Sequence, residues 1–80
     1  MDPRQRLRRF LVEELQIQPE QVATDDSPLI SSHVIDSLDL LQVVSFLEGA
    51  FEVAVTDEEI VPDNFETIGA ITRLVESKRG

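Results

Sequence analysis

The tetrapeptide Asp36-Ser37-Leu38-Asp39 lies between a loop rich in turn formers and a strongly apolar run, Leu40 to Phe51. Asp36 suits the N-cap of a helix, because its carboxylate can accept hydrogen bonds from the free backbone N–H groups of the first turn. Asp39 stands three residues later, where a capping-box acid belongs. Ser37 is then the first helical residue, with its hydroxyl in the positive end of the helix dipole. A helix N-terminus stabilises an anion, so this hydroxyl is a good place to carry a phosphodiester.

The same motif also has a purely structural interpretation. Ser and Asp are frequent at helix starts because they cap free N–H groups, and Asp-Ser-Leu is only a tripeptide. Taken alone, the motif favours the structural interpretation. The remainder of the chain decides between it and a modified serine.

The helix that begins at the motif is expected to span residues 37–51 and to be central to the fold. Its apolar residues occupy more than one stripe, which indicates contacts with several neighbouring elements. They are Leu38, Leu40, Leu41, Val43, Val44, Phe46, Leu47, Ala50 and Phe51. Its polar face holds Asp39, Gln42, Ser45, Glu48 and Glu52.

Three further helices are expected, which predicts an all-α four-helix bundle with three longer helices and a short third one. The first spans residues 3–17, with Asp2 as N-cap, Pro3 in its first turn and one apolar face. That face holds Leu7, Phe10, Leu11 and Leu15. The capping box Thr56-Asp57-Glu58-Glu59 starts the short helix, which Pro62 stops after one or two turns. The last helix begins near Thr67 and repeats Ile68, Ile71, Leu74 and Val75 at helical spacing.

A long loop over residues 18–34 joins the first two helices, and a loop of this length in a small domain is often functional. Val22, Leu29 and Ile30 are expected to anchor it under the helices. His33 is interpreted as an ordinary loop residue, because no Ser or Cys nucleophile is paired with it in a known arrangement; a general base is the alternative. The short β-branched segment 53–55 is interpreted as an extended link.

Charge is distributed very unevenly along the chain. The 80 residues include 16 acidic and 7 basic ones, a formal net charge of -9. Between Phe10 and Thr72 there is no Lys or Arg, but there are fourteen Asp or Glu. Such a segment repels nucleic acid and anionic membranes, so its expected partners are proteins with basic patches. An arginine cluster at the start of the chain lacks interleaved aromatic residues and does not indicate a nucleic-acid site.

The composition also excludes several kinds of chemistry. There is no cysteine, hence no disulfide, no thiol nucleophile and no Cys-based zinc site. The acidic run 57–66 lacks the residue pattern of a calcium loop, and no metal site is expected. No catalytic constellation is recognisable, so an enzyme is not expected. No apolar run is long enough for a membrane span and no signal peptide is evident, which predicts one cytoplasmic domain over residues 1–80, expected to be a monomer.

Taken together, the motifs resemble the acyl carrier protein family over roughly residues 7–75. The resemblance rests on four stretches that occur in the right order: Ile35-Asp36-Ser37-Leu38 at the helix start, Phe46-Leu47-Glu48 with Phe51 along that helix, Asp57-Glu58-Glu59, and Phe65-Glu66-Thr67-Ile68. It implies a four-helix bundle with a short third helix. These stretches together are far more specific than the tripeptide alone.

The resemblance also implies a chemistry for Ser37. In this family a phosphopantetheinyl transferase uses coenzyme A and magnesium to attach 4'-phosphopantetheine to the motif serine, and Asp36 matches the motif acid. The arm ends in a thiol and carries acyl, aminoacyl or polyketide groups as thioesters. The implied partners are the transferase, a loading ligase or transferase and downstream synthase enzymes with basic patches. Positions that match or lie near those read by partners are Leu38, Asp39, Gln42, Glu48, Asp57 and Glu58.

Three positions depart from the usual pattern of the family. Val34 stands where a Gly is usual, Gln42 where many fatty-acid carriers have Glu, and Ser45 where they have Met. The acidic recognition face is therefore thinner, which favours a carrier in a specialised acyl, aminoacyl, polyketide or nonribosomal peptide pathway. Two alternatives stay open at this point: a housekeeping carrier for fatty acid biosynthesis, and an unmodified helical protein-interaction module.

Overall fold

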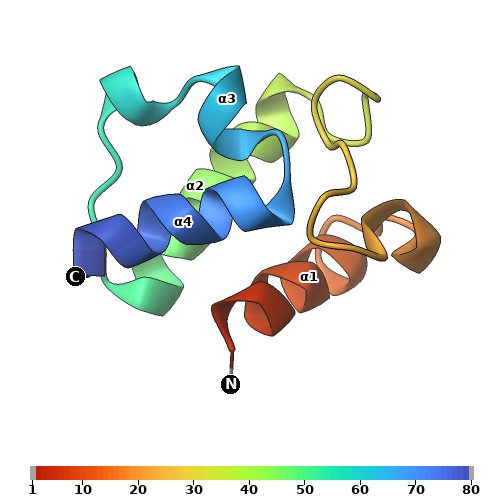
Figure 1. The fold of residues 1–80 in the computed structure, drawn as a ribbon, viewed down its shortest axis with the longest axis horizontal. Helices are drawn as coiled ribbons and strands as arrows, with labels where there is room; N and C mark the ends of the chain where they lie inside the picture. Colours follow the sequence, from red (N-terminus) through yellow and green to blue (C-terminus); the bar gives the residue numbers. More distant parts are fainter. Residues whose placement is uncertain (1, 80) are drawn as a thin grey trace.

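The structure, a computed structural model, describes residues 2–79 (Figure 1). This part of the chain forms four α-helices, with α4 in front of α2 in the view of Figure 1, and it contains no strand. The helices are α1 (Pro3–Glu13), α2 (Ser37–Phe51), α3 (Pro62–Phe65) and α4 (Ile68–Arg79). Two single 3-10 turns, η1 (Pro19–Val22) and η2 (Asp57–Glu59), lie in the connections. The predicted all-α fold with three longer helices and a short third one is confirmed.

Helix α1 starts as predicted but is shorter than the predicted range 3–17. Asp2 is the N-cap and accepts from the backbone N–H of Arg4 at 3.0 Å. The helix ends at Glu13 because Gln16 takes a left-handed conformation, with φ 57°, that reverses the chain. The backbone N–H of Ile17 then donates to Leu11 O at 3.0 Å, and the Ile17 side chain is buried. Burial of this side chain favours the reversal over another turn of helix.

The long connection after α1 is fixed by two buried anchors and one acidic residue. Val22 and Leu29 are fully buried, as predicted. Asp25 pairs with Arg8 at 2.8 Å and with Arg4 at 3.0 Å, so two residues of the arginine cluster hold the loop onto α1. The backbone of Asp25 also accepts from Gly69 N at 2.9 Å, and a Cβ on Gly69 would lie 3.3 Å from this oxygen. The glycine thus permits the close approach of the loop to α4.

Helix α2 has the predicted bounds, but its apolar residues are not all buried. Val43, Val44, Leu47 and Phe51 face the core. Leu38 and Leu41, by contrast, are 66% and 56% exposed. The C-terminal end of α2 is covered by Arg6, which donates to Ala50 O at 3.3 Å and lies 4.8 Å from the centre of the Phe51 ring. A cation at this position also complements the negative end of the helix dipole.

The third helix begins at Pro62, so the prediction that Pro62 ends it is wrong. Residues 57–59 make a single 3-10 turn, in which the Glu59 carboxylate accepts from Thr56 N at 2.9 Å. Lys78 Nζ lies 2.6 Å from Glu59, and this hydrogen bond lowers the pKa of the Glu59 carboxyl. Val61 is extended because the residue before a proline disfavours the helical conformation. Pro62 then supplies a suitable first helical residue.

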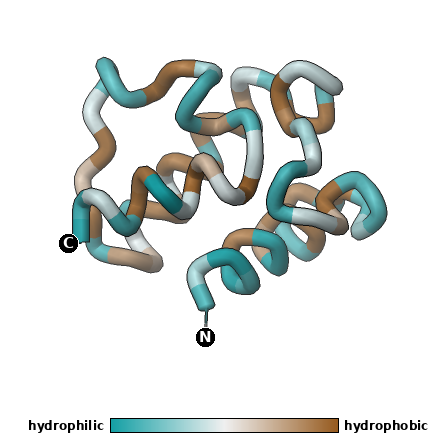
Figure 2. The backbone as a smooth tube through the Cα atoms, in the orientation of Figure 1, coloured by the Kyte–Doolittle hydropathy of each residue, from teal (hydrophilic) through white to brown (hydrophobic). Residues whose placement is uncertain are grey.

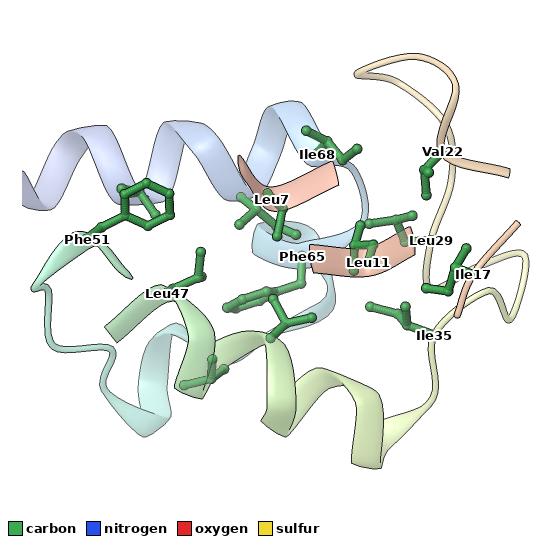
Figure 3. Close-up of a cluster of buried hydrophobic side chains, with 14 residues drawn as sticks. Leu7, Leu11, Ile17, Val22, Leu29, Ile35, Leu47, Phe51, Phe65 and Ile68 are labelled. Atoms are coloured by element: carbon green, nitrogen blue, oxygen red, sulfur yellow. The ribbon is translucent and has the colours of Figure 1, made fainter. Parts of the chain in front are cut away.

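The core lies where all four helices meet (Figure 3). Along α1 and α4 the tube in Figure 2 alternates between brown, apolar residues and teal, polar residues, as expected for helices with one buried face. Phe65 of α3 is fully buried between Leu47, Leu7 and Leu11 in Figure 3. Helix α4 begins after Thr67, whose hydroxyl accepts from Ala70 N at 3.0 Å, and adds the predicted Ile68, Ile71 and Val75. The short helix α3 is therefore held by burial rather than by its own hydrogen bonds.

Candidate functional site

Ser37 is the first residue of α2 and is exposed. Ser37 and Leu38 belong to the first helical turn, whose backbone N–H groups have no acceptor within the helix. These donors, together with the positive end of the helix dipole, favour an anion at this point. The hydroxyl is therefore open to reaction and stands where a phosphodiester would be stabilised.

Asp36 and Asp39 form the predicted reciprocal capping box. Asp36 Oδ1 accepts from Asp39 N at 2.8 Å, and Asp39 Oδ2 accepts from Asp36 N at 3.2 Å. The two carboxylates thus fix the point at which α2 starts. Asp39, predicted as a partner-recognition residue, uses one of its oxygens within the protein.

Replacing Asp36 with alanine should lower the free energy of unfolding by about 0.5–2 kcal/mol, because the N-cap hydrogen bond is lost. Urea denaturation followed by circular dichroism measures this change. Asp36→Asn is the matched control, since an asparagine oxygen caps nearly as well and should recover most of the loss. Equal unfolding midpoints for the parent and Asp36→Ala would contradict the role of the cap.

The loop before Ser37 is clamped by Glu66, which lies between α3 and α4. Glu66 Oε1 accepts from the backbone N–H groups of Leu29, Ile30 and Ser31 at 3.0–3.1 Å and from the Ser31 hydroxyl at 3.2 Å. These hydrogen bonds, the one from Ser31 N first, lower the pKa of the Glu66 carboxyl. The charged carboxylate therefore holds the loop that leads to the serine.

This clamp should make the stability of the protein depend on acid pH. The pKa of Glu66 is lowered by folding, so its stabilising effect is fully present above the ordinary glutamate pKa of about 4.3 and is lost as the pH falls through the lower, folded value. Thermal melts between pH 6 and pH 3 should show a shallower decline for Glu66→Gln than for the parent. Glu76→Gln, at an exposed position of α4, should follow the parent; parallel curves for parent and Glu66→Gln would contradict the clamp.

A hollow of about 350 Å³ adjoins Ser37. It is bordered by the preceding loop, the first turn of α2 and the start of α3. The lining residues are Ile30, His33, Ile35, Asp36, Ser37, Leu40 and Pro62. His33 is exposed and left-handed, with φ 61°, and its backbone N–H donates to Ile30 O at 3.0 Å. Val34, which stands where the family usually has a glycine, does not have a positive φ.

The outer face of α2 carries two of the residues that were predicted to contact partner enzymes. Leu38 and Gln42 are exposed there, beside Leu41. A second hollow, of about 430 Å³, lies between α1 and α2 and is lined by Phe10, Leu41, Gln42, Ser45 and Phe46. The rings of Phe10 and Phe46 stack in its wall at a centroid distance of 4.4 Å.

The remaining predicted partner residues lie elsewhere or have structural duties. Glu48 Oε2 accepts from Val55 N at 2.9 Å and so holds the extended link after α2. Asp57 and Glu58 are exposed on η2, which Figure 1 shows apart from the start of α2. The sequence did not assign Leu41 or Glu66 a role at the site. Leu41 carried no signal other than its apolar character, and Glu66 is remote from the loop in sequence.

Residues 2–79 contain no group of three or more His, Asp or Glu side chains that could hold a metal ion. Within the same range, no helix is both long and apolar enough to cross a membrane.

Comparisons with known proteins agree on one family. Residues 5–75 match the family model described as phosphopantetheine attachment site. The chain is 30% identical over 73 residues to the acyl carrier protein of Wolinella succinogenes, covering 91% of this chain and 92% of the relative. It is 33% identical over 72 residues to the acyl carrier protein homolog of Mycoplasmopsis pulmonis, covering 90% and 94%. The acyl carrier protein of Phenylobacterium zucineum is 27% identical over 79 residues, covering 99% and 96%.

The match covers the capping box, Ser37 and the Glu66 clamp, all of which lie within residues 5–75. A phosphopantetheine group is therefore the cofactor, and the chain acts as a carrier rather than as an enzyme. The family model that matches residues 5–75 and the similarity to these relatives show, in agreement with the helical fold, that the chain belongs to the acyl carrier protein family.

Proposed function

We propose that Ser37 is the residue to which phosphopantetheine is attached, and that residues 1–80 act as one discrete carrier domain. The observation that carries the proposal is the exposed hydroxyl of Ser37 as the first residue of α2, directly after the N-cap Asp36. The free N–H groups of the first turn stabilise the phosphodiester that forms there. Asp36 fixes the helix start and so the direction in which these N–H groups point.

The surroundings of Ser37 fit this group. The hollow beside the serine has walls of Ile30, Ile35, Leu40 and Pro62, which suit the apolar parts of an arm or its cargo. When attached, the group supplies a thiol that holds the cargo as a thioester. The chain has no cysteine of its own, so no internal thiol competes for the cargo.

The outer face of α2 is the surface on which partner enzymes dock in this proposal. Leu38 and Leu41 are exposed there, and the net charge of -9 attracts basic patches. The partners are a phosphopantetheinyl transferase, a loading ligase or transferase, and downstream synthase enzymes. The carrier meets them as a monomer in the cytoplasm.

A specialised pathway is favoured over housekeeping fatty-acid synthesis by the chemistry of this face. Gln42 and Ser45 line the hollow between α1 and α2 together with Leu41. An uncharged amide and a hydroxyl here offer no ion pair to a basic partner, whereas a glutamate at the same point would. Partner enzymes that need such an ion pair are therefore discriminated against.

Intact-mass measurement tests the attachment. The folded protein is incubated with coenzyme A, magnesium and a broad-specificity phosphopantetheinyl transferase, and the gain of one phosphopantetheinyl group is expected. Fragmentation should place the added mass on the peptide that contains Ser37. No gain on folded protein would overturn the proposal and favour an unmodified helical interaction module. Efficient malonyl loading and chain extension by a fatty-acid synthase would favour the housekeeping carrier.

A further inference from the structure

Attachment at Ser37 creates a local excess of negative charge. A phosphodiester carries one negative charge at neutral pH, and here it would adjoin the Asp36 carboxylate. Between Phe10 and Thr72 the chain has no Lys or Arg that could offset it. No Lys or Arg lines the hollow beside Ser37 either. Among the residues that line this hollow, His33 is the one whose side chain can become a cation, and Asp36 is the other titratable residue.

The backbone that carries His33 at this hollow is fixed by hydrogen bonds within the loop. The N–H of His33 donates to Ile30 O at 3.0 Å, and the N–H of Val34 donates to Leu29 O at 2.9 Å. Leu29 and Ile30 are themselves fixed by Glu66. His33 therefore belongs to a turn that is tied down at both ends.

The conformation of His33 is one that glycine would adopt without strain. Its φ of 61° lies in the left-handed region, which costs most L-residues free energy. The chain nevertheless has a titratable side chain at this turn.

We propose that His33 binds the phosphodiester carried by Ser37 and, when protonated, offsets the repulsion between that group and Asp36. The proposal rests on the attachment at Ser37 proposed above. His33 is thus a positioning residue: it orients the start of the arm over the hollow and takes no part in the chemistry of the thioester. Its hold on the arm weakens as the pH rises and the imidazole loses its proton.

Proton NMR of the imidazole tests this directly, because the chain contains one histidine and its ring signals need no further assignment. The pH midpoint of the His33 titration is measured in the unmodified and the modified protein at low ionic strength. It should rise by about half a pH unit on modification, the effect of one added negative charge several ångströms away near the surface. The rise should shrink in high salt. An unchanged midpoint in protein shown by mass to be fully modified would overturn the role of His33 and leave the attachment at Ser37 intact.

A reciprocal measurement uses the phosphorus nucleus. In the modified parent the 31P resonance should move across the pH range in which His33 titrates, although the phosphodiester itself does not titrate there. His33→Asn should abolish this movement, since asparagine tolerates the left-handed turn but takes up no proton. His33→Gly removes the strain from the turn and should abolish the movement of the 31P resonance equally. This result would show that the effect comes from the imidazole and not from the backbone conformation. A 31P resonance that moves alike in the parent and both variants would contradict the proposal.

Discussion

Ser37→Ala should abolish phosphopantetheinylation completely, because the variant lacks the hydroxyl to which we propose that the arm is attached. In the assay with coenzyme A, magnesium and the transferase, its intact mass should stay unchanged while the parent gains one group. Alanine is a good helix former, and Ser37 is exposed. The variant should therefore melt close to the parent, and loss of modification cannot be ascribed to unfolding.

Ser45→Ala is the matched control for this experiment. Ser45 also lies exposed on α2, two turns further along and away from the helix N-terminus. The variant should be modified to the same extent as the parent. Modification of Ser37→Ala, or its loss in Ser45→Ala alone, would place the attachment elsewhere and contradict the proposed site.

Phe65→Ala should have the largest effect on stability, lowering the free energy of unfolding by about 3–5 kcal/mol. Phe65 is fully buried, and its helix α3 comprises only Pro62–Phe65. So short a helix has no stability of its own and depends on this side chain. For a chain of 80 residues the total stability is about 4–12 kcal/mol, so the loss is a large part of it. Denaturation in urea or guanidinium chloride measures the difference.

The control for Phe65→Ala is Leu38→Ala. Leu38 is also a large apolar residue, but it is 66% exposed and should cost less than about 0.5 kcal/mol. Unfolding midpoints that fall equally in both variants would show that burial does not decide the effect. Because Pro62 lines the hollow beside Ser37, the loss of Phe65 should also loosen one wall of that hollow.

The sequence predicted best those helix ends that depend on residues close together in the chain. The start of α2 followed from a capping box whose two partners, Asp36 and Asp39, are three residues apart. The end of α1 did not follow, because it depends on Ile17 turning back into a core formed by distant segments. The prediction for Pro62 failed for a similar reason: a proline can stop one helix or begin the next, and the burial of Phe65, which the sequence does not show, decides.

The candidate site shows the same division. Ser37 and Asp36 lie in one local motif, so their positions at the start of α2 could be predicted. The roles of Glu66 and Glu48 could not be read from the sequence, since both carboxylates accept from backbone N–H groups that belong to other segments. The position of His33 at the hollow beside Ser37 could not be predicted either, because it depends on how the loop folds onto α2 and α3.

The Glu66 clamp has a consequence for the order of events during synthesis. The backbone groups that it holds, from Leu29 to Ser31, lie 35–37 residues before it in the chain. Before Glu66 has been synthesised, Ser37 can already lie in a nascent helix, but the loop that precedes it has no anchor. The proposed attachment site, with its loop anchored, therefore exists only once Glu66 has been made. A transferase that reads the anchored loop would act on the completed domain and pass over unfinished chains.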